Sequence, residues 1–590
     1  MEVRRNFDLL SRYAENFQKE DALCFKHEGK WKKFSTEEYI SHSVNFCRGL
    51  YRLGFRKGDK IITVSSNRPE WNFSDLGMAM IGVVHVPVFA SLNTSEYQHI
   101  IKDSGAKMIL ISDTKHYKGM GQAFEFEGFS SLLYTFDNVT GVKNWMEILD
   151  LGASADAATL KEIEDIKASI TENSFATLIY TSGTTGRPKG VMLSHRNLVS
   201  NFISAASVFN LNPKDKYLSI LPLCHVGGRM GNYQTQYSGA SIYYAESMGS
   251  IAVNIQEIKP DGFDAVPRIL EKFYDVIIAK GKKLNGIKRL LFFWAVKLGL
   301  NYKPFGENGW LYEIRLKLAD KLIFSKWRAA LGGNVRIVGC GGASLPPRLE
   351  KIFWAAGIKI INMYGLTETS PIITINRTFR GGVKLGSVGY VIEGVEVKIA
   401  DDGEILCKGP DVMLGYHNDP ELTASVFDSD GWFHTGDIGY LEDGKFLMVT
   451  DRKKEIFKLS NGKYIAPQLI ENIFRESNII DQIMVVGEHE KFASALISPN
   501  FRYFEEMKSS GKIGFSDAEE LIRNPEIQSF FSSEIEKFNK KLSPPERINR
   551  FRLVPDEWSP ASGELSPTLK LRRQFITNKY RTLLEQVYIK

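Results

Sequence analysis

A glycine-rich loop that directly follows an apolar strand constrains this chain more than any other feature of its sequence. Residues 176–180 are apolar and β-forming, and the ten residues after them, TSGTTGRPKG, are dense in glycine, threonine and serine. A strand that runs into such a loop presents backbone N–H groups and hydroxyls around a concavity, and glycine lets a phosphate approach the backbone closely. We therefore predict a polyphosphate site formed by Thr181, Ser182, Gly183, Thr184, Thr185, Gly186 and Lys189.

Two other interpretations of this loop have to be weighed. A flexible polar linker has a similar composition, but Pro188 and the apolar strand before the loop argue against one. A Walker A loop places its lysine between a glycine and a serine or threonine, whereas Lys189 follows Pro188 and precedes Gly190. The spacing therefore disfavours a P-loop NTPase or kinase.

The first two hundred residues alternate short strands and helices. We expect strands at residues 61–65, 83–89 and 107–112, a helix over 69–81, and a helix that begins after Ser194. Alternation at this spacing is typical of parallel βαβ units. It predicts an α/β chain in which parallel-rich sheets are packed with helices.

Length and composition indicate an ordinary globular protein with a large core. Of the 590 residues, 43% are hydrophobic and 24% are charged. The five cysteines form no CxxC pair, which argues against a disulfide framework or structural zinc and is typical of a reducing cytosol. The first twenty residues lack the apolar core of a signal peptide, so we expect a cytoplasmic protein.

The positive charge of the chain is concentrated in residues 280–330. This segment holds twelve Lys and Arg against three acidic residues, a net charge of +9, whereas the whole chain carries +6. Its two helical patterns, at 288–298 and 311–327, interleave basic residues with Phe292, Phe293, Trp294 and Trp327. Such helices suit the surface of an anionic membrane, while a helix pair docked on the core with a solvated basic face explains the pattern equally well. Nucleic acid is not the partner we expect.

Turns rich in polar residues or glycine follow several other expected strands. In an α/β sheet, ligand contacts gather at the carboxyl ends of the strands. A strand at 217–223 leads to His225, which is either a ligand contact or a structural histidine. Strands at 335–339 and 358–363 lead to turns that contain Gly341, Gly342, Ala343, Tyr364, Gly365, Thr367 and Glu368. A tyrosine there can stack on a flat ring, and a glutamate is a hard oxygen ligand for Mg²⁺.

Together these motifs resemble the AMP-forming adenylate superfamily, which includes acyl-CoA synthetases, luciferases and peptide-synthetase adenylation domains. TSGTTGRPKG is similar to its phosphate loop, and YGLTE at 364–368 is similar to its adenine and magnesium motif. The resemblance implies that Glu368 and Thr184 hold Mg²⁺, and that His225 lies beside the bound carboxylate. It also implies that the turns after the two later strands hold the nucleotide.

A second dense block, at residues 430–472, resembles the signature of long-chain fatty acyl-CoA synthetases. The resemblance implies that Asp437 and Arg452 bind the ribose, that Lys458 contributes to the nucleotide site, and that the chain pivots near residues 452–454. Lys570, in the sequence PTLK, is similar to the catalytic lysine of the superfamily, although a lone lysine in a basic tail is usually a solvated charge. The implied architecture is a large domain of residues 1–451, with a distorted β-barrel subdomain, and a small, mobile α+β domain of residues 452–590.

The implied reaction has two steps. A long-chain fatty acid is activated by ATP to acyl-AMP, and coenzyme A then forms the thioester; the expected catalytic residues are Lys189, His225, Glu368 and Lys570. ATP, Mg²⁺ and coenzyme A are the expected cofactors, and the basic segment would contact an anionic membrane. We also expect a homodimer, although no sequence motif indicates one. The alternatives are a fatty acyl-AMP ligase that loads a carrier protein, a catalytically inert lipid-binding relative, and an oxidative luciferase.

Overall fold

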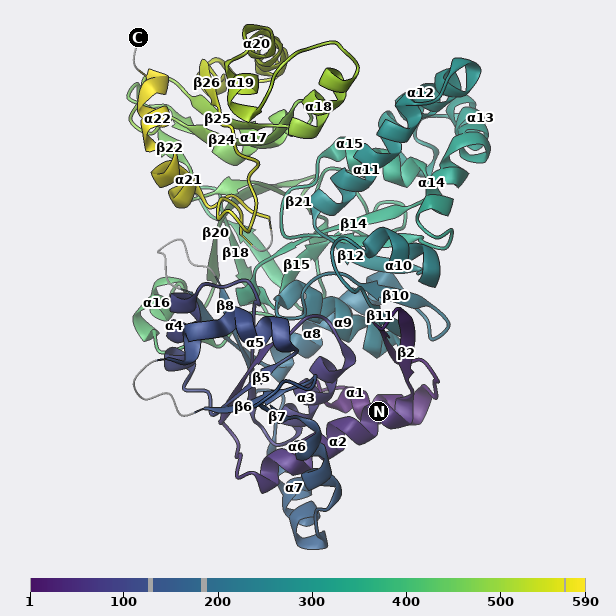
Figure 1. The fold of residues 1–590 in the computed structure, drawn as a ribbon, viewed down its shortest axis with the longest axis vertical. Helices are drawn as coiled ribbons and strands as arrows, with labels where there is room; N and C mark the ends of the chain where they lie inside the picture. The colour runs from purple at the N-terminus through teal and green to yellow at the C-terminus, as the bar shows by residue number, and fades with distance from the viewer. Residues whose placement is uncertain (1, 126–130, 182–187, 567–568, 589–590) are drawn as a thin grey trace. The chain divides into compact units, whose positions relative to one another are not determined.

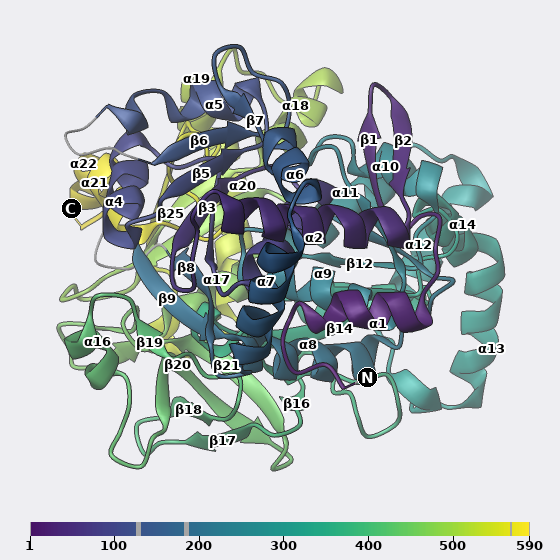
Figure 2. The same ribbon diagram turned by 90° about the horizontal axis from the view of Figure 1, so that it is seen from below.

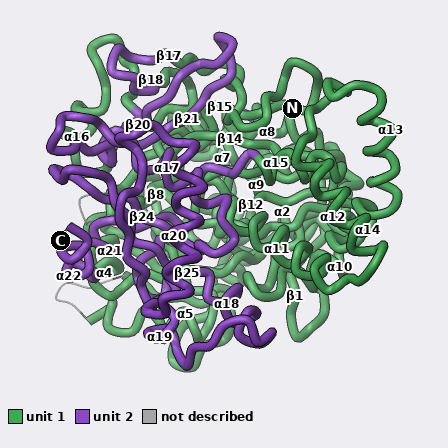
Figure 3. Tube along the Cα trace, turned by 90° about the horizontal axis from the view of Figure 1, so that it is seen from above, with its two compact units in different colours: residues 1–342, 348–397, 407–434 green, residues 343–347, 398–406, 435–590 purple. Residues whose placement is uncertain are grey.

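The computed structural model describes residues 2–125, 131–181, 188–566 and 569–588 (Figure 1). Contacts along the chain divide it into two compact units, which Figure 3 distinguishes by colour. Unit 1 consists of residues 1–342, 348–397 and 407–434, and unit 2 consists of residues 343–347, 398–406 and 435–590.

Unit 1 contains an eight-stranded sheet that is mostly parallel (Figure 2). Its strand order is β19-β9-β8-β4-β3-β5-β6-β7. The parallel strands are β3 (Lys60–Val64), β4 (Val84–Val88), β5 (Met108–Ile111), β6 (Leu132–Thr135), β7 (Lys143–Asn144) and β8 (Phe175–Thr181). Two antiparallel strands, β9 (Lys189–Ser194) and β19 (Gly415–Tyr416), extend the edge beyond β8.

A nine-stranded sheet forms the second layer of unit 1, in the order β16-β15-β14-β13-β12-β10-β11-β1-β2. Its parallel strands are β1 (Leu23–His27), β10 (Lys216–Ser219), β11 (Ser241–Tyr244), β12 (Gly262–Ala265), β13 (Ile337–Cys340) and β14 (Lys359–Gly365). The antiparallel strands at its edges are β2 (Lys30–Phe34), β15 (Ile372–Ile375) and β16 (Tyr390–Val391). Parallel pairing of this extent needs both faces covered by helices.

Helix α3 (Pro69–Met80) lies between the two sheets of unit 1. All of its residues are buried, which a helix that faces solvent on one side cannot achieve. Its Asn72 is hydrogen-bonded to Tyr244 of the nine-stranded sheet, and its Asp75 to His85 of the eight-stranded sheet. Helices α8 (His195–Phe209) and α9 (Val226–Ser238) are also buried over most of their lengths. The sheets therefore enclose a shared helical layer.

The remaining helices of this part of the chain include the basic segment. They are α1 (Asp8–Asn16), α2 (Thr36–Arg52), α4 (Thr94–Ser104), α5 (Thr114–Met120), α6 (Met146–Ala153), α7 (Ala157–Ser169), α10 (Ile251–Ile258), α11 (Pro267–Lys282), α12 (Gly286–Leu300), α13 (Trp310–Ala319), α14 (Ser325–Ala330), α15 (Pro347–Ala355) and α16 (Pro420–Ser425). The single helix expected over 311–327 is interrupted by a π-helical turn, Asp320–Phe324. Of the two alternatives for this segment, Phe292 and Trp327 fit docking on the core: both are buried, and the ring of Trp327 lies against those of Phe292 and Phe324.

Unit 2 has its own apolar core around a three-stranded sheet, in the order β24-β25-β26. The strands are β24 (Ile480–Val486), β25 (Ser494–Pro499) and β26 (Arg550–Leu553), and the associated helices are α17 (Pro467–Phe474), α18 (Phe501–Ser509), α19 (Ala518–Arg523), α20 (Pro525–Asn539), α21 (Arg573–Lys579) and α22 (Arg581–Tyr588). A two-stranded sheet consists of β22 (Phe457–Lys458) and β23 (Tyr464–Ile465).

A four-stranded sheet is formed within residues 396–452, and the distorted β-barrel subdomain stays a prediction. The strands of this sheet are β17 (Glu396–Ile399), β18 (Glu404–Lys408), β20 (Phe433–Glu442) and β21 (Phe446–Arg452). The mixed α/β class, with a large sheet-rich N-terminal part and a smaller C-terminal part, is confirmed. Among the described helices, none combines the length and the apolar character that crossing a membrane requires.

Candidate nucleotide-binding site

The predicted phosphate loop connects two paired strands of unit 1. Thr181, the last residue of β8, is the register partner of Lys189, the first residue of β9, so the base of the loop is closed by antiparallel pairing. Both residues are half-buried. His99 on α4 holds the end of the loop, with Nε2 at 3.1 Å from the carbonyl oxygen of Pro188. Ser182, Gly183, Thr184, Thr185 and Gly186 lie outside the described residues.

Tyr416 brings the loop lysine and the acidic motif residue together. Its hydroxyl donates a hydrogen bond of 2.8 Å to Oε1 of Glu368, and Nζ of Lys189 lies 5.6 Å from the centroid of its ring. Strand β19 places Tyr416 there by pairing with β9, opposite Val191. Two of the predicted phosphate and metal residues therefore lie on either side of one tyrosine, which the sequence motifs did not identify.

Two buried asparagines of α8 hold the turn that carries Glu368. Asn201 donates to the carbonyl oxygens of Thr369 and Ile372 and accepts from the N–H of Ile372. One turn earlier, Asn197 donates to two carbonyl oxygens in the segment that leads to Tyr416. Asn197 also completes the capping box with Ser194, so the predicted helix start is confirmed. Helix α8 thus fixes both partners of the Glu368–Tyr416 bond.

The residues predicted for the adenine pocket follow β13 and β14. Tyr364 and Gly365 end β14, Thr367 begins a short 3₁₀ turn, and Gly341 and Gly342 follow β13. Gly365 admits no side chain, because a Cβ there would lie 1.6 Å from the carbonyl oxygen of Pro371. Gly342 has a φ of +83°, which favours glycine. Ala343 is exposed and belongs to the short 343–347 segment of unit 2.

His225 is the N-cap of α9 and is half-buried beside Phe89. Its Nδ1 accepts a hydrogen bond of 3.1 Å from the N–H of Gly227. A neutral imidazole that accepts at Nδ1 carries its proton on Nε2. The ring can therefore present an N–H donor, the group that a substrate carboxylate binds. The role predicted for His225 is compatible with this geometry.

A buried ionic network connects α9 to the strand that carries the phosphate loop. Arg229, one turn beyond His225, is 1% exposed and bonds to Asp75, Tyr233 and the hydroxyl of Thr177 on β8. Burial opposes the charge of Asp75, but Arg229 and His85 hold its pKa below the ordinary value. The network anchors the start of α9 against β8, four residues before the loop begins.

Among the described residues, no group of three His, Cys, Asp or Glu side chains could hold a metal ion. Mg²⁺ does not need one, because it usually takes one or two carboxylates together with substrate phosphates and water. Glu368, half-buried and with one oxygen oriented by Tyr416, is such a carboxylate. The donor set therefore fits a magnesium ion that arrives with a nucleotide.

Unit 2 holds the residues predicted for the ribose. Asp437 on β20 and Arg452 on β21 face each other in the strand register, and Nε of Arg452 lies 2.8 Å from Oδ1 of Asp437. Thr435, two residues earlier on β20, supports Asp437, because its hydroxyl accepts from the N–H of Asp437 and donates to the carbonyl of Ile405. A carboxylate held in place by a guanidinium can accept from the two hydroxyls of a sugar.

The predicted pivot is flanked by ion pairs. Lys453 bonds to Asp402 at 2.6 Å and to Glu404 at 2.7 Å, whereas Lys454 is exposed. Two residues beyond Lys453, Glu455 bonds to Arg573 at 2.7 Å. Lys454 lies between these anchored positions, which all belong to unit 2, and its role as a pivot stays a prediction. Lys458 lies over the ring of Tyr464, on the neighbouring strand β23.

Lys570 lies on a surface turn of unit 2. Its side chain is exposed, and its backbone is held by the hydroxyl and the N–H of Ser566. The preceding residue, Leu569, has a φ of +62°, in the left-handed region that favours glycine. Its side chain packs against the apolar cluster that includes Trp558 and Leu565. The apolar contact of the leucine side chain therefore offsets the strain of its backbone.

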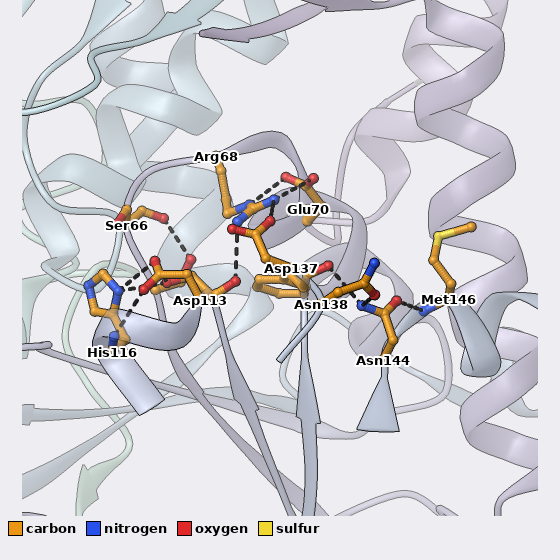
Figure 4. Close-up of polar contacts among 12 residues, drawn as sticks. Ser66, Arg68, Glu70, Asp113, His116, Asp137, Asn138, Asn144 and Met146 are labelled. Carbon is orange, nitrogen blue, oxygen red and sulfur yellow. Dashed lines mark hydrogen bonds and ion pairs between the residues drawn. The ribbon is translucent and has the colours of Figure 1, made fainter. Parts of the chain in front are cut away.

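A second polar cluster lies at the carboxyl ends of β3, β5 and β6 (Figure 4). Connections from β3 and β5 run in opposite directions, and in open α/β sheets ligands bind at such switch points. Here Arg68 is bonded to Glu70 and to Asp137 at 2.8–2.9 Å, and Asp113 is bonded to His116 at 2.7 Å. Arg68 compensates part of this acidic charge, and the hydrogen bonds and ion pairs explain the cluster as a structural network that connects the ends of these three strands.

Comparisons with known proteins agree with the geometry. The model of the family described as AMP-binding enzyme matches residues 10–417, and that of the AMP-binding enzyme C-terminal domain matches residues 454–590. The chain belongs to the AMP-binding enzyme family. It is 32% identical to the long-chain-fatty-acid–CoA ligase FadD15 of Mycobacterium bovis, over 96% of this chain and 97% of that protein.

Other similar proteins extend the comparison. The long-chain-fatty-acid–CoA ligase ACSBG2 of Rattus norvegicus is 28% identical over 98% of this chain and 92% of its own length. The anthranilate CoA ligase AuaEII, solved with anthranoyl-AMP, superposes with a TM-score of 0.73 at 17% identity, covering 98% of both chains. ATP-bound MatB of Rhodopseudomonas palustris gives 0.70 at 20% identity, over 99% of this chain and all of that one. These structures share the fold, and the predicted family is confirmed.

Proposed function

We propose that this AMP-binding enzyme is a fatty acid–CoA ligase for long acyl chains, which forms acyl-AMP and then the coenzyme A thioester. The full-length similarity to long-chain ligases supports the substrate class. The structural observation that best supports the proposal is that Tyr416 contacts both Glu368 and Lys189, the first residue of β9.

In the first step, the substrate carboxylate attacks the α-phosphate of ATP and pyrophosphate leaves. Negative charge grows on the phosphate oxygens, so positive and N–H donors placed beforehand lower the barrier. Lys189 supplies one charge, and the turns after β13 and β14 supply backbone donors. His225 would orient the carboxylate through Nε2. A magnesium ion on Glu368 would add further charge compensation when ATP is bound. No general base is needed, because the carboxylate is already ionised.

The second step replaces AMP by the thiol of coenzyme A at the acyl carbon. Lys570 is proposed to act in the first step and to leave before the second, by rotation of the C-terminal domain near residues 452–454. Lys570→Ala should therefore slow acyl-AMP formation by about 10²-fold or more, as loss of one transition-state contact does, and should spare thioester formation from supplied acyl-AMP. An equal loss in both half-reactions would contradict this division of roles.

Acyl-chain recognition should depend mainly on apolar burial. Each buried methylene contributes about 0.8 kcal/mol, so four more carbons in a tunnel can add about 3 kcal/mol. The direct test measures pyrophosphate release with fatty acids of about eight to about twenty carbons, with and without coenzyme A. We expect the highest kcat/KM with the longer acids. A preference for the shortest acids would remove the long-chain assignment while leaving the ligase intact.

A fatty acyl-AMP ligase that serves a carrier protein is the second candidate. It shares the first step and differs in the acceptor, so coenzyme A would not accelerate AMP release. The similarity to CoA ligases over nearly the whole chain favours coenzyme A. Release of AMP that is independent of coenzyme A would favour the carrier-protein alternative.

We also propose that the enzyme meets its substrate at an anionic membrane surface through residues 280–330. The net charge of +9 on this segment supports the contact. A homodimer remains our expectation for the oligomeric state, which light scattering after size exclusion measures directly.

A further inference from the structure

Helices α12 and α13 expose large apolar side chains that the core does not use. Ile287 and Leu290 on α12 are 74% and 72% exposed, and Trp310 at the start of α13 is 70% exposed. Three more exposed residues, Leu311, Ile314 and Leu318, follow along α13. Figures 1 and 2 show the two helices side by side at the edge of unit 1. We call these six residues the α12–α13 face.

The exposed residues of α13 form one continuous stripe. At about 100° per residue, Trp310, Ile314 and Leu318 fall on the same side of the helix, and Leu311 lies beside them. The opposite side is anchored: Ala319 is buried, and the hydroxyl of Tyr312 donates a hydrogen bond of 2.7 Å to the carbonyl of Leu298 on α12. The stripe therefore points away from the protein.

Helix α12 is docked in the same manner. Its buried side consists of Phe292, Ala295, Val296 and Gly299, and a Cβ on Gly299 would lie 2.9 Å from Ile352. Ile287 and Leu290 lie on the other side. The two helices thus present their apolar stripes to solvent while a separate set of apolar residues holds them to the core. Packing within this protein therefore does not explain why the exposed residues of α12 and α13 are apolar.

Basic side chains border the stripes. On the helical wheel of α13, Arg315 lies at one edge of the stripe and Lys317 at the other, and both are exposed. Lys288 and Arg289, next to Leu290, are exposed as well. An ion pair inside the segment joins Arg328 to Asp320, away from the exposed stripes. An apolar stripe bordered by cations is the pattern of helices that lie in the interface of a bilayer.

We infer that the α12–α13 face inserts its six apolar side chains into the headgroup region of an anionic phospholipid bilayer, with the bordering Lys and Arg bound to lipid phosphates. The inference deepens the proposed function, on which it rests: a long-chain fatty acid resides in membranes, so the face places the ligase at its substrate. The residues of this face differ from Phe292 and Trp327, which are buried in the core.

Charge and shape favour a bilayer over two other occupants. A second copy of this face would bring two segments of +9 together, and like charges across an interface cost affinity. A nucleic acid would use the cations, but a protruding row of Ile and Leu side chains offers nothing to a phosphate backbone. A bilayer uses both the apolar stripe and its basic border.

The test is flotation of the full-length protein with phosphatidylcholine vesicles, with and without phosphatidylglycerol. We expect binding to anionic vesicles at about 0.1 M salt and much weaker binding at about 0.5 M. Trp310→Ser/Ile314→Ser should weaken binding about tenfold or more for each anchor removed. Arg315→Gln/Lys317→Gln should weaken binding to anionic vesicles by about fivefold for each charge and should not change binding to neutral ones.

Matched controls separate this face from general exposure or charge. Val253 on α10 is 55% exposed, and Lys161 on α7 is exposed. Val253→Ser and Lys161→Gln should bind vesicles like the wild type. All variants should keep the wild-type rate on a short, water-soluble fatty acid, so failure of the ligase and failure of the docking face are told apart.

Three results would overturn the inference. The first is wild-type protein that does not float with anionic vesicles at low salt. The second is a Trp310→Ser/Ile314→Ser variant that floats like the wild type. The third is a wild-type dimer in light scattering that this variant dissociates, which would assign the face to a second copy of the chain.

Discussion

The hydroxyl of Tyr416 donates a hydrogen bond of 2.8 Å to Oε1 of Glu368. The same ring lies under Nζ of Lys189, so one side chain from an edge strand of two residues orients both the acidic and the basic member of the predicted phosphate site. Tyrosine suits this position because its hydroxyl binds the carboxylate and its ring face attracts the ammonium group.

Substituting Tyr416 separates these two contacts. Tyr416→Phe removes the hydrogen bond and keeps the ring, and a bond to a charged group is worth about 1.5–3 kcal/mol. We expect kcat/KM for ATP to fall about tenfold or more, with a higher Mg²⁺ requirement, because Glu368 loses its orientation. Tyr416→Leu also removes the cation–π contact, so its kcat/KM for ATP should be lower still. Steady-state kinetics over a magnesium titration measure both; a Phe variant with an unchanged magnesium dependence would contradict the assigned role.

Much of this site could be predicted from the sequence because its motifs are continuous. The strand before the loop, the helix start at Ser194 and the turn at residues 364–368 are local patterns, and the structure has each of them. Tyr416, Asn197 and Asn201 could not be predicted, because their partners lie 48 to 215 positions away. Local patterns do not encode which distant turn a strand of two residues will join.

In the basic segment, residues 280–330, the helices could be predicted but the sides that face the core could not. Its helices and charge are evident in the sequence, but hydrophobic periodicity cannot tell which apolar stripe faces the core when a helix carries two. Phe292 and Trp327 are buried, whereas Ile287, Leu290 and Trp310 are exposed. Only the packing of α12 on its neighbours decides between them.

Arg229 and Asp75 are predicted to stabilise unit 1 as a pair. Arg229→Met leaves the buried carboxylate of Asp75 without its main partner, which should lower the free energy of unfolding by about 3–5 kcal/mol. The double variant Asp75→Asn/Arg229→Met removes both charges and should recover part of that loss. Urea unfolding of the four proteins gives the coupling energy. Losses that simply add would show that the two side chains act independently.

The same network should affect catalysis through α9. Arg229→Lys keeps the charge but loses the planar fork that reaches both Asp75 and Thr177. We expect a folded protein whose KM for the fatty acid rises several-fold, because His225 at the start of α9 is less well positioned, while KM for ATP changes little. Parallel increases in both KM values would point to general loosening instead.

Leu569 is predicted to matter for the Lys570 turn more than for stability. Leu569→Gly relieves about 1–2 kcal/mol of left-handed strain and gives up a comparable amount of apolar contact, so the free energy of unfolding should change by less than about 1 kcal/mol. The turn loses its contact with the Trp558 cluster, and acyl-AMP formation should slow. Stopped-flow measurement of the first half-reaction, with thioester formation from supplied acyl-AMP as the control, tests this. Unchanged adenylation would mean that the leucine contact does not position Lys570.

Glu350 on α15 should make stability depend on pH. Burial raises the pKa of its carboxyl to about 8, although Oε2 accepts a hydrogen bond of 2.6 Å from the N–H of Gly386. The folded state therefore keeps a proton that the unfolded chain releases at its ordinary pKa of about 4.3. Because the folded state binds more protons between these values, the stability contributed by this group falls as pH rises from about 4.5 to about 8, by up to about 1.4 kcal/mol per pH unit.

Glu350→Gln isolates this effect from other buried acids such as Asp411, whose pKa burial raises to about 7. The amide mimics the protonated carboxyl, so the variant should match the wild type near pH 5 and become progressively more stable than it toward pH 8. Thermal unfolding of both proteins at several pH values gives the difference, in which the contributions of the other acids cancel. A stability difference between variant and wild type that stays constant from about pH 5 to about pH 8 would show that Glu350 is ionised in the folded protein. Groups other than the N–H of Gly386 would then have to compensate its charge.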